Sequence, residues 1–195
     1  MQGKLAELRR KWASEGDKWP RIVHEMRMRI GINTGALTTG NMGSAVRMNY
    51  TMMGDAVNLA ARLESAAKQY GVYTMISQYT YEMVKDKFET RQLDKIQVVG
   101  KSEPVVVYEL IAEKGRLEPD TVRMMETYTN GLALFYQRQW DKAIEVLSES
   151  EKWEPFREVA PKNMSPSRKI IGYCRDYKAA PPPDDWDGVM QLTSK

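Results

Sequence analysis

The chain has 195 residues, 42% of them apolar, which suits a globular domain with an appendage and excludes a disordered protein. Its 29 basic and 26 acidic residues leave a net charge of +3, so no nucleic-acid partner is expected. Cys174 is the single cysteine, which excludes an intrachain disulfide and a cysteine-based zinc site and favours a reducing compartment such as the cytoplasm.

The first elements in chain order are a helix and two strands. Leu5, Leu8 and Trp12 recur at helical spacing and predict a helix that ends near Ser14. From Glu25, apolar and basic residues alternate in EMRMRIGIN, which predicts a strand with one buried face. The glycine-rich stretch TGALTTGNMGS is predicted to be a loop, and VRMNYTMM a second strand. The two strands are therefore expected to pair as a hairpin with a long connection.

Helices and strands continue to alternate. A helix is predicted to begin at Gly54 and Asp55, with Asp55 as its cap, and to end at Gly71. VYTMI is predicted to be a short strand, and Ser77 the N-cap of the next helix. QLDKIQVVG and PVVVYELIAE flank a turn and predict a hairpin that ends near Ala112. This alternation predicts an α/β or α+β sheet with helices packed on it.

The sequence pattern changes from alternating strands and helices to helices alone at the charged segment EKGRLEP. We expect residues 1–113 to form the sheet-containing part, 114–119 a linker, and 120–195 an α-helical tail with a Pro-rich end. Apolar positions in the tail, from Gly131 to Leu147, resemble a single tetratricopeptide unit. One such unit cannot bury its own apolar face, so we expect it to pack on the sheet or on a second chain.

Asn58 and Arg62 are the leading candidates for chemistry. They lie four residues apart on the helix that begins near Gly54, so their side chains share one face. Arginine offers a permanent charge and a planar set of donors suited to phosphate, and asparagine can orient a hydroxyl group or a sugar. A solvated polar stripe would show the same bare spacing.

The other candidates have weaker signals. The glycine-rich stretch could approach a phosphate, but a hairpin connection is the better explanation of it. His24 is the only histidine, which speaks against a Ser-His or histidine-metal site. Lys101 lies at a turn, where its ammonium group could reach a triphosphate or simply be solvated.

Four segments in order, RIGINTG, GNMGS, YTMMGDAVNLAARLE and VVGKSEPVVVYEL, resemble the C-terminal half of a class III nucleotide cyclase catalytic domain. The resemblance spans residues 26–112 and implies an N-terminally truncated, ferredoxin-like cyclase fold. It also implies conversion of ATP to 3′,5′-cyclic AMP and pyrophosphate at the interface of a homodimer, with two Mg²⁺ or Mn²⁺ ions.

The resemblance assigns roles to individual residues. Asn58 matches the asparagine that orients the ribose, and Arg62 matches the arginine that stabilises charge on the transferring phosphate. Thr51 falls at the position that helps to select the base. The family's triphosphate-binding lysine is replaced by Val99, and Lys101, two positions on, is the candidate substitute.

The resemblance also implies what lies outside this chain. The family's two metal-binding aspartates and its adenine-recognising lysine would precede Met1, so no metal ligand is assigned here and the chain alone is expected to be inactive. The tail resembles the natural C-terminus of some bacterial sensor cyclases. No apolar run could span a membrane, so a membrane or sensor region is expected only in the N-terminal part of the parent, with the cyclase domain in the cytoplasm.

Two alternatives remain open. A single threonine at position 51 does not exclude guanylate cyclase activity. The departure at Val99 and the absent aspartates also allow a non-catalytic dimerisation or regulatory module.

Overall fold

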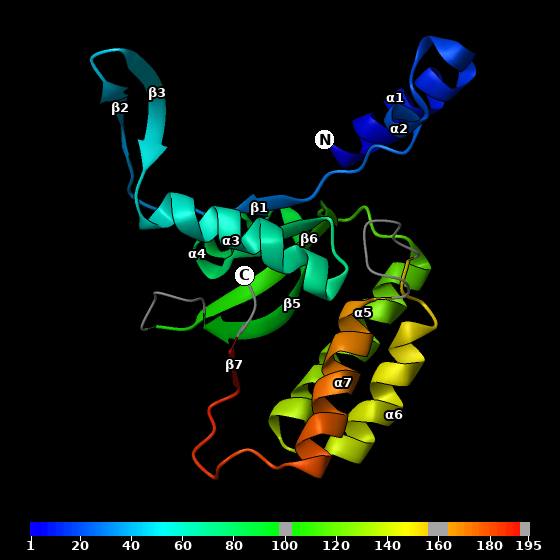
Figure 1. Ribbon diagram of the computed structural model, residues 1–195. Helices are drawn as coiled ribbons and strands as arrows, with labels where there is room; N and C mark the ends of the chain where they lie inside the picture. The colour runs from blue at the N-terminus through cyan, green and yellow to red at the C-terminus, as the bar shows by residue number, and fades with distance from the viewer. Residues whose placement is uncertain (98–102, 156–163, 192–195) are drawn as a thin grey trace.

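The N-terminal segment forms helices that lie at the edge of the molecule. The computed structural model describes residues 1–97, 103–155 and 164–191. α1 (Gln2–Ser14) confirms the first predicted helix, and a short 3-10 helix, η1 (Gly16–Lys18), and α2 (Arg21–His24) follow it. None of these helices carries a fully buried residue. In Figure 1 they project from the sheet rather than covering it.

Five of the described strands form one mixed sheet. The strands are β1 (Ile30–Ile32), β2 (Thr38–Ser44), β3 (Arg47–Met53), β4 (Thr74–Ser77), β5 (Phe88–Gln97), β6 (Val105–Glu113) and β7 (Val189–Gln191). The sheet has the order β1-β4-β6-β5-β7, and β2 and β3 form a separate hairpin. β1 pairs in parallel with β4, and β7 pairs in parallel with β5. β6 lies between β4 and β5 and is antiparallel to both. The predicted α/β class and the β5–β6 hairpin are confirmed.

The predicted hairpin near the N-terminus is wrong in its pairing. β1 pairs with β4, and the glycine-rich stretch that we expected to be a loop forms β2, which pairs with β3 around a turn at Ala45 and Val46. β1 is also shorter than predicted. Met26, which we expected on the buried face of this strand, lies before β1 and is 45% exposed. Gly43 of β2 permits the close approach of β3 beside this turn, because a Cβ on Gly43 would stand 2.1 Å from the Arg47 carbonyl oxygen.

α3 (Asp55–Tyr70) begins and ends at glycines. Gly54 has φ 141° and occupies the N-cap position, and no side chain caps the helix, so the expectation that Asp55 is the cap is wrong. Gly71, with φ 68°, ends the helix in the left-handed conformation as predicted. Ser77 is the predicted N-cap of α4 (Gln78–Val84), and its Oγ accepts a hydrogen bond from the Thr80 amide.

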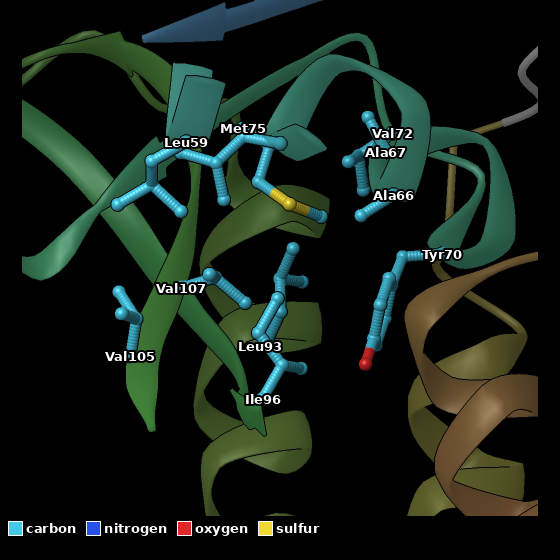
Figure 2. Packing of buried hydrophobic residues seen from close by; sticks show 11 residues of the cluster. Leu59, Ala66, Ala67, Tyr70, Val72, Met75, Leu93, Ile96, Val105 and Val107 are labelled. Carbon is cyan, nitrogen blue, oxygen red and sulfur yellow. The ribbon is translucent and has the colours of Figure 1, made fainter. Parts of the chain in front are cut away.

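α3 packs on one face of the five-stranded sheet. Leu59 and Leu63 of α3 meet Met75 of β4 and Val107 of β6 in a cluster that Figure 2 shows from close by. Tyr108 lies on the opposite face, because side chains alternate along a strand, and it stacks on Tyr81 of α4 with ring centroids 4.0 Å apart. The sheet is therefore covered by α3 on one side and by α4 on the other.

The C-terminal helices form a second cluster beside the sheet. α5 (Pro119–Tyr136), α6 (Trp140–Glu151) and α7 (Pro166–Ala179) lie side by side (Figure 1). Their shared core includes Tyr128, Phe135, Leu147 and Ile170. The Tyr128 hydroxyl donates to the Leu93 carbonyl oxygen of β5 at 3.2 Å, so the helices also contact the sheet. Among the described residues, no helix has the length and apolar character needed to cross a membrane.

A buried charge cluster joins the helices to the sheet. The Arg91 guanidinium of β5 contacts the Glu109 carboxylate of β6 at 2.6 Å and the Glu154 carboxylate beyond α6 at 2.7 Å. All three side chains are at most 5% exposed. Burial alone would lower the pKa of Arg91, but the two carboxylates raise it above its ordinary value.

The chain after α7 returns to the sheet as a strap, residues 180–191. Trp186 packs among the rings of Phe135, Trp140 and Tyr177, and the strap ends in β7, which pairs with the edge of β5. Arg138 holds the strap by donating hydrogen bonds to the Pro183 and Asp184 carbonyl oxygens. The strap thus covers what would otherwise be an open edge of the sheet.

Candidate functional site

Asn58 and Arg62 lie together on an exposed flank of α3. Both side chains are exposed, although each directly precedes a fully buried leucine, Leu59 and Leu63. Successive residues in a helix are rotated by roughly 100°, so the two polar groups stand beside the buried stripe rather than opposite it. The sheet fixes this rotation, because a Cβ on Gly31 of β1 would meet the Ala60 carbonyl oxygen of α3 at 2.2 Å.

On this flank, Arg62 provides a positive charge and Asn58 is its polar neighbour. The Glu64 carboxylate lies 3.2 Å from the guanidinium of Arg29, the residue directly before β1. Asp55 is exposed in the first turn of α3. An exposed guanidinium with an amide one helical turn away can bind a phosphate and a sugar hydroxyl together.

Thr51 lies on the β2–β3 hairpin, four residues before α3 begins. It is exposed and stands opposite Gly40 in the register of the hairpin. The hairpin projects away from the five-stranded sheet as an arm (Figure 1). Met48, Tyr50 and Met52 alternate along one face of this arm and are 63%, 73% and 56% exposed.

Lys101 and Val99 lie outside the described residues. Within residues 1–97, 103–155 and 164–191, no three His, Cys, Asp or Glu side chains come close enough to hold a metal ion. Two divalent ions need several carboxylate oxygens converging on one point. The residues described do not fit such a metal pair.

The far end of α3 carries a buried polar contact that sequence reasoning missed. The Tyr70 hydroxyl donates to the Asp94 carboxylate at 2.7 Å, and both residues are fully buried. Burial raises the pKa of Asp94 from 3.8 to about 7, and the hydrogen bonds from Tyr70 and the Lys95 amide oppose this rise. The sequence signal for this contact is an acidic residue, Asp94, inside the strand pattern LDKI.

Comparisons with known proteins identify the family of this chain. Residues 5–112 match the family model described as the adenylate and guanylate cyclase catalytic domain. This match covers more than half of the chain, including α3 and the arm. The chain therefore belongs to the family of adenylate and guanylate cyclase catalytic domains.

Individual relatives match about half of the chain. The chain is 37% identical over 119 residues to the terminal-differentiation-specific adenylate cyclase of Dictyostelium discoideum, which is 59% of this chain and 6% of that protein. It is 38% identical over 87 residues to adenylate cyclase 1 of Rhizobium meliloti, 45% of this chain and 13% of that one. The crystal structure of the adenylyl cyclase CyaB from P. aeruginosa aligns with a TM-score of 0.48 at 37% identity, covering 60% of this chain and 56% of that one. The chain thus spans only a part of each of these relatives.

Proposed function

We propose that this chain is the C-terminal half of an adenylate cyclase catalytic domain and that its parent protein converts ATP to 3′,5′-cyclic AMP and pyrophosphate. The observation that carries the proposal is the pairing of Asn58 and Arg62 on one exposed flank of α3, inside the region that matches the cyclase family. Both relatives described above as similar in sequence are named adenylate cyclases.

Arg62 and Asn58 have separate roles in the proposed reaction. The ribose 3′-oxygen attacks the α-phosphorus, the bond to the β-phosphate oxygen breaks, and pyrophosphate leaves while the 3′-hydroxyl proton is lost. Arg62 stabilises the charge that develops on the transferring phosphate. Asn58 holds the ribose so that its 3′-oxygen faces the phosphorus. Thr51 accepts or donates a hydrogen bond at the base and favours adenine, and Lys101 contacts the triphosphate.

The proposed active site is shared between two copies of the chain in a homodimer. In one copy Asn58 and Arg62 face solvent, where water screens the charge of a guanidinium and weakens its hold on phosphate. A second copy would exclude this water. The apolar face of the arm supports the same assembly, because an isolated two-stranded hairpin with exposed Met48, Tyr50 and Met52 is only marginally stable in water.

Two Mg²⁺ or Mn²⁺ ions would supply the electrophilic activation of the phosphate in this reaction. Their carboxylate ligands and the adenine-recognising lysine are proposed to lie in sequence upstream of Met1. The chain by itself is accordingly proposed to be inactive. We place the reaction in the cytoplasm, with any sensor or membrane-anchoring region in the same upstream part.

The C-terminal helices have a supporting role in this proposal. We divide the chain into a cyclase part at residues 1–113, a linker at 114–119 and a C-terminal part at 120–195, which contributes α5, α6 and α7 and returns to the sheet through β7. α5 and α6 are proposed to form one tetratricopeptide-like helix pair. Its apolar face is covered by α7 and by the sheet, through Tyr128 and Arg91.

Product analysis tests the proposal. A longer protein that contains this chain and its upstream sequence should form cyclic AMP and pyrophosphate from ATP in the presence of Mg²⁺ or Mn²⁺, and the 195-residue chain should form neither. Cyclic GMP as the main product from an equimolar mixture of ATP and GTP would instead make the parent a guanylate cyclase. No cyclic nucleotide from either substrate would contradict the proposal.

A further inference from the structure

One side chain ties together the three elements that meet at the base of the arm. Asn33 directly follows β1, and its Nδ2 donates a hydrogen bond to the Ala56 carbonyl oxygen in the first turn of α3 at 3.0 Å. Its Oδ1 accepts a hydrogen bond from the Ser77 hydroxyl at 2.6 Å. Ser77 ends β4 and caps α4. The amide therefore uses its donor toward α3 and its acceptor toward β4.

The backbone around Asn33 is closely packed. The chain enters the arm at residues 34–37 and leaves it at residues 54–56. A Cβ on Gly35 would lie 2.9 Å from the Ala56 Cβ, and a Cβ on Gly54 would lie 3.5 Å from the Leu37 Cα. The Thr34 hydroxyl group lies 3.0 Å from the Thr80 hydroxyl group of α4. The two ends of the arm thus touch each other beside Asn33.

This junction lies between the residues proposed to act on the nucleotide. Ala56 stands two residues before Asn58 in α3, and Thr51 lies on the strand that leads into Gly54. A rotation of the N-terminal part of α3 about the helix axis would move Asn58 and Arg62 relative to the arm. Displacements of about 1 Å at a catalytic group can reduce a rate by about 100-fold.

We propose that Asn33 is a positioning residue that sets the angle between the β2–β3 arm and α3 and so holds Thr51, Asn58 and Arg62 in one arrangement. Its catalytic consequence rests on the proposed function, whereas its effect on α3 does not. The role requires an amide, because an aspartate at position 33 could accept from Ser77 but would present a carboxylate oxygen to the Ala56 carbonyl. Alanine would lose both contacts.

Amide hydrogen exchange on the 195-residue chain tests the structural part without any activity. In Asn33→Ala and Asn33→Asp, the amides of Val57, Asn58 and Ala60 should exchange at least tenfold faster than in the wild type, with protection in α5 unchanged. Asn130→Ala, which removes an exposed asparagine of α5, is the matched control and should leave α3 unchanged. Wild-type protection of the first turn of α3 in both Asn33 variants would overturn the proposal.

Steady-state kinetics on a complete cyclase that contains this chain test the catalytic part. Asn33→Asp should lower kcat at least tenfold with KM for ATP within threefold of the wild type, and should change the ratio of ATP to GTP turnover through Thr51. A residue with only a structural role would lower the yield of folded enzyme and leave kcat per folded molecule unchanged, which would overturn the proposal. An inactive wild-type enzyme would contradict the proposed function, and the exchange measurement would still decide the role of Asn33.

Discussion

Arg91 and Glu154 lie 63 residues apart in the sequence and form a buried ion pair, with the arginine Nη1 2.7 Å from the glutamate Oε1. Glu109 completes the cluster from the neighbouring strand. Because Arg91 belongs to the sheet and Glu154 follows α6, this pair links the sheet to the C-terminal helices.

Glu154→Ala should lower the free energy of unfolding by about 3–5 kcal/mol, because it leaves the buried Arg91 charge incompletely compensated. Denaturant unfolding followed by circular dichroism measures this change. Glu149→Ala is the matched control, since it removes a solvent-exposed partner of Lys152 and should leave the stability nearly unchanged. Equal effects of the two substitutions would show that the buried pair does not stabilise the contact between sheet and helices.

The stability of the chain should depend on Asp94 between pH 4 and 7. Burial raises the pKa of Asp94 from 3.8 to about 7, so in this range the folded chain keeps a proton that the unfolded chain has lost. The contribution of Asp94 to stability is therefore full below about pH 4 and is lost as the pH rises through about 7. Asp94→Asn should flatten this part of the curve of unfolding free energy against pH. An unchanged slope in the variant would assign the pH dependence to other groups.

Gly31→Ala should destabilise the chain by about 3 kcal/mol, because the added methyl group would push α3 away from β1. Gly172→Ala in α7 is the opposite case, since nothing lies within 4 Å of the new Cβ and the substitution should stabilise the helix by about 0.5–1 kcal/mol. Thermal unfolding of both variants checks the pair. A Gly31→Ala variant as stable as the wild type would contradict the close contact between β1 and α3.

Arg62→Ala should reduce kcat by about 100-fold or more in a complete cyclase that contains this chain, while KM for ATP changes little. The reason is that the guanidinium interacts most strongly with charge that develops in the transition state. Arg123→Ala, which removes an exposed arginine of α5 far along the chain, serves as the control. Turnover that survives Arg62→Ala would remove this residue from the proposed mechanism.

Trp186→Ala should cost about 2 kcal/mol of stability, because the indole packs on Phe135 and Tyr177 and lies under the Arg138 guanidinium. Trp186→Phe keeps part of the ring packing and should cost less. Chemical unfolding compares the two variants with the wild type. If both variants matched the wild type, the strap would have no stabilising role.

The sequence predicted those elements whose signals are local. α3 is predictable because a glycine stands at each end of a run of good helix formers. The role of Ser77 as an N-cap is predictable because a serine directly precedes a helical pattern. Asn58 and Arg62 were predicted to share a face because helical geometry alone places residues four apart together. The exposed flank of α3 agrees with that expectation.

The missed features depend on contacts between distant segments. The pairing of β1 with β4 and the strand character of the glycine-rich stretch were missed, because a local pattern does not say which strand is the neighbour. A register shift between Gln92 and Asp94 turns both Leu93 and Asp94 into buried residues, which simple alternation along a strand does not predict. The roles of Arg91 and Asn33 likewise become visible only when their partners are in place.

The pairing of β7 with β5 ties the C-terminal end of the described chain back to the sheet. Lys95 and Asp187 are 92 positions apart and form an ion pair beside this pairing, so the chain closes a large loop through the helices. Tryptic cleavage at the exposed Arg116 would therefore yield two pieces that remain associated and co-elute. Heating should likewise melt the sheet and the helices in a single transition rather than as two separate modules.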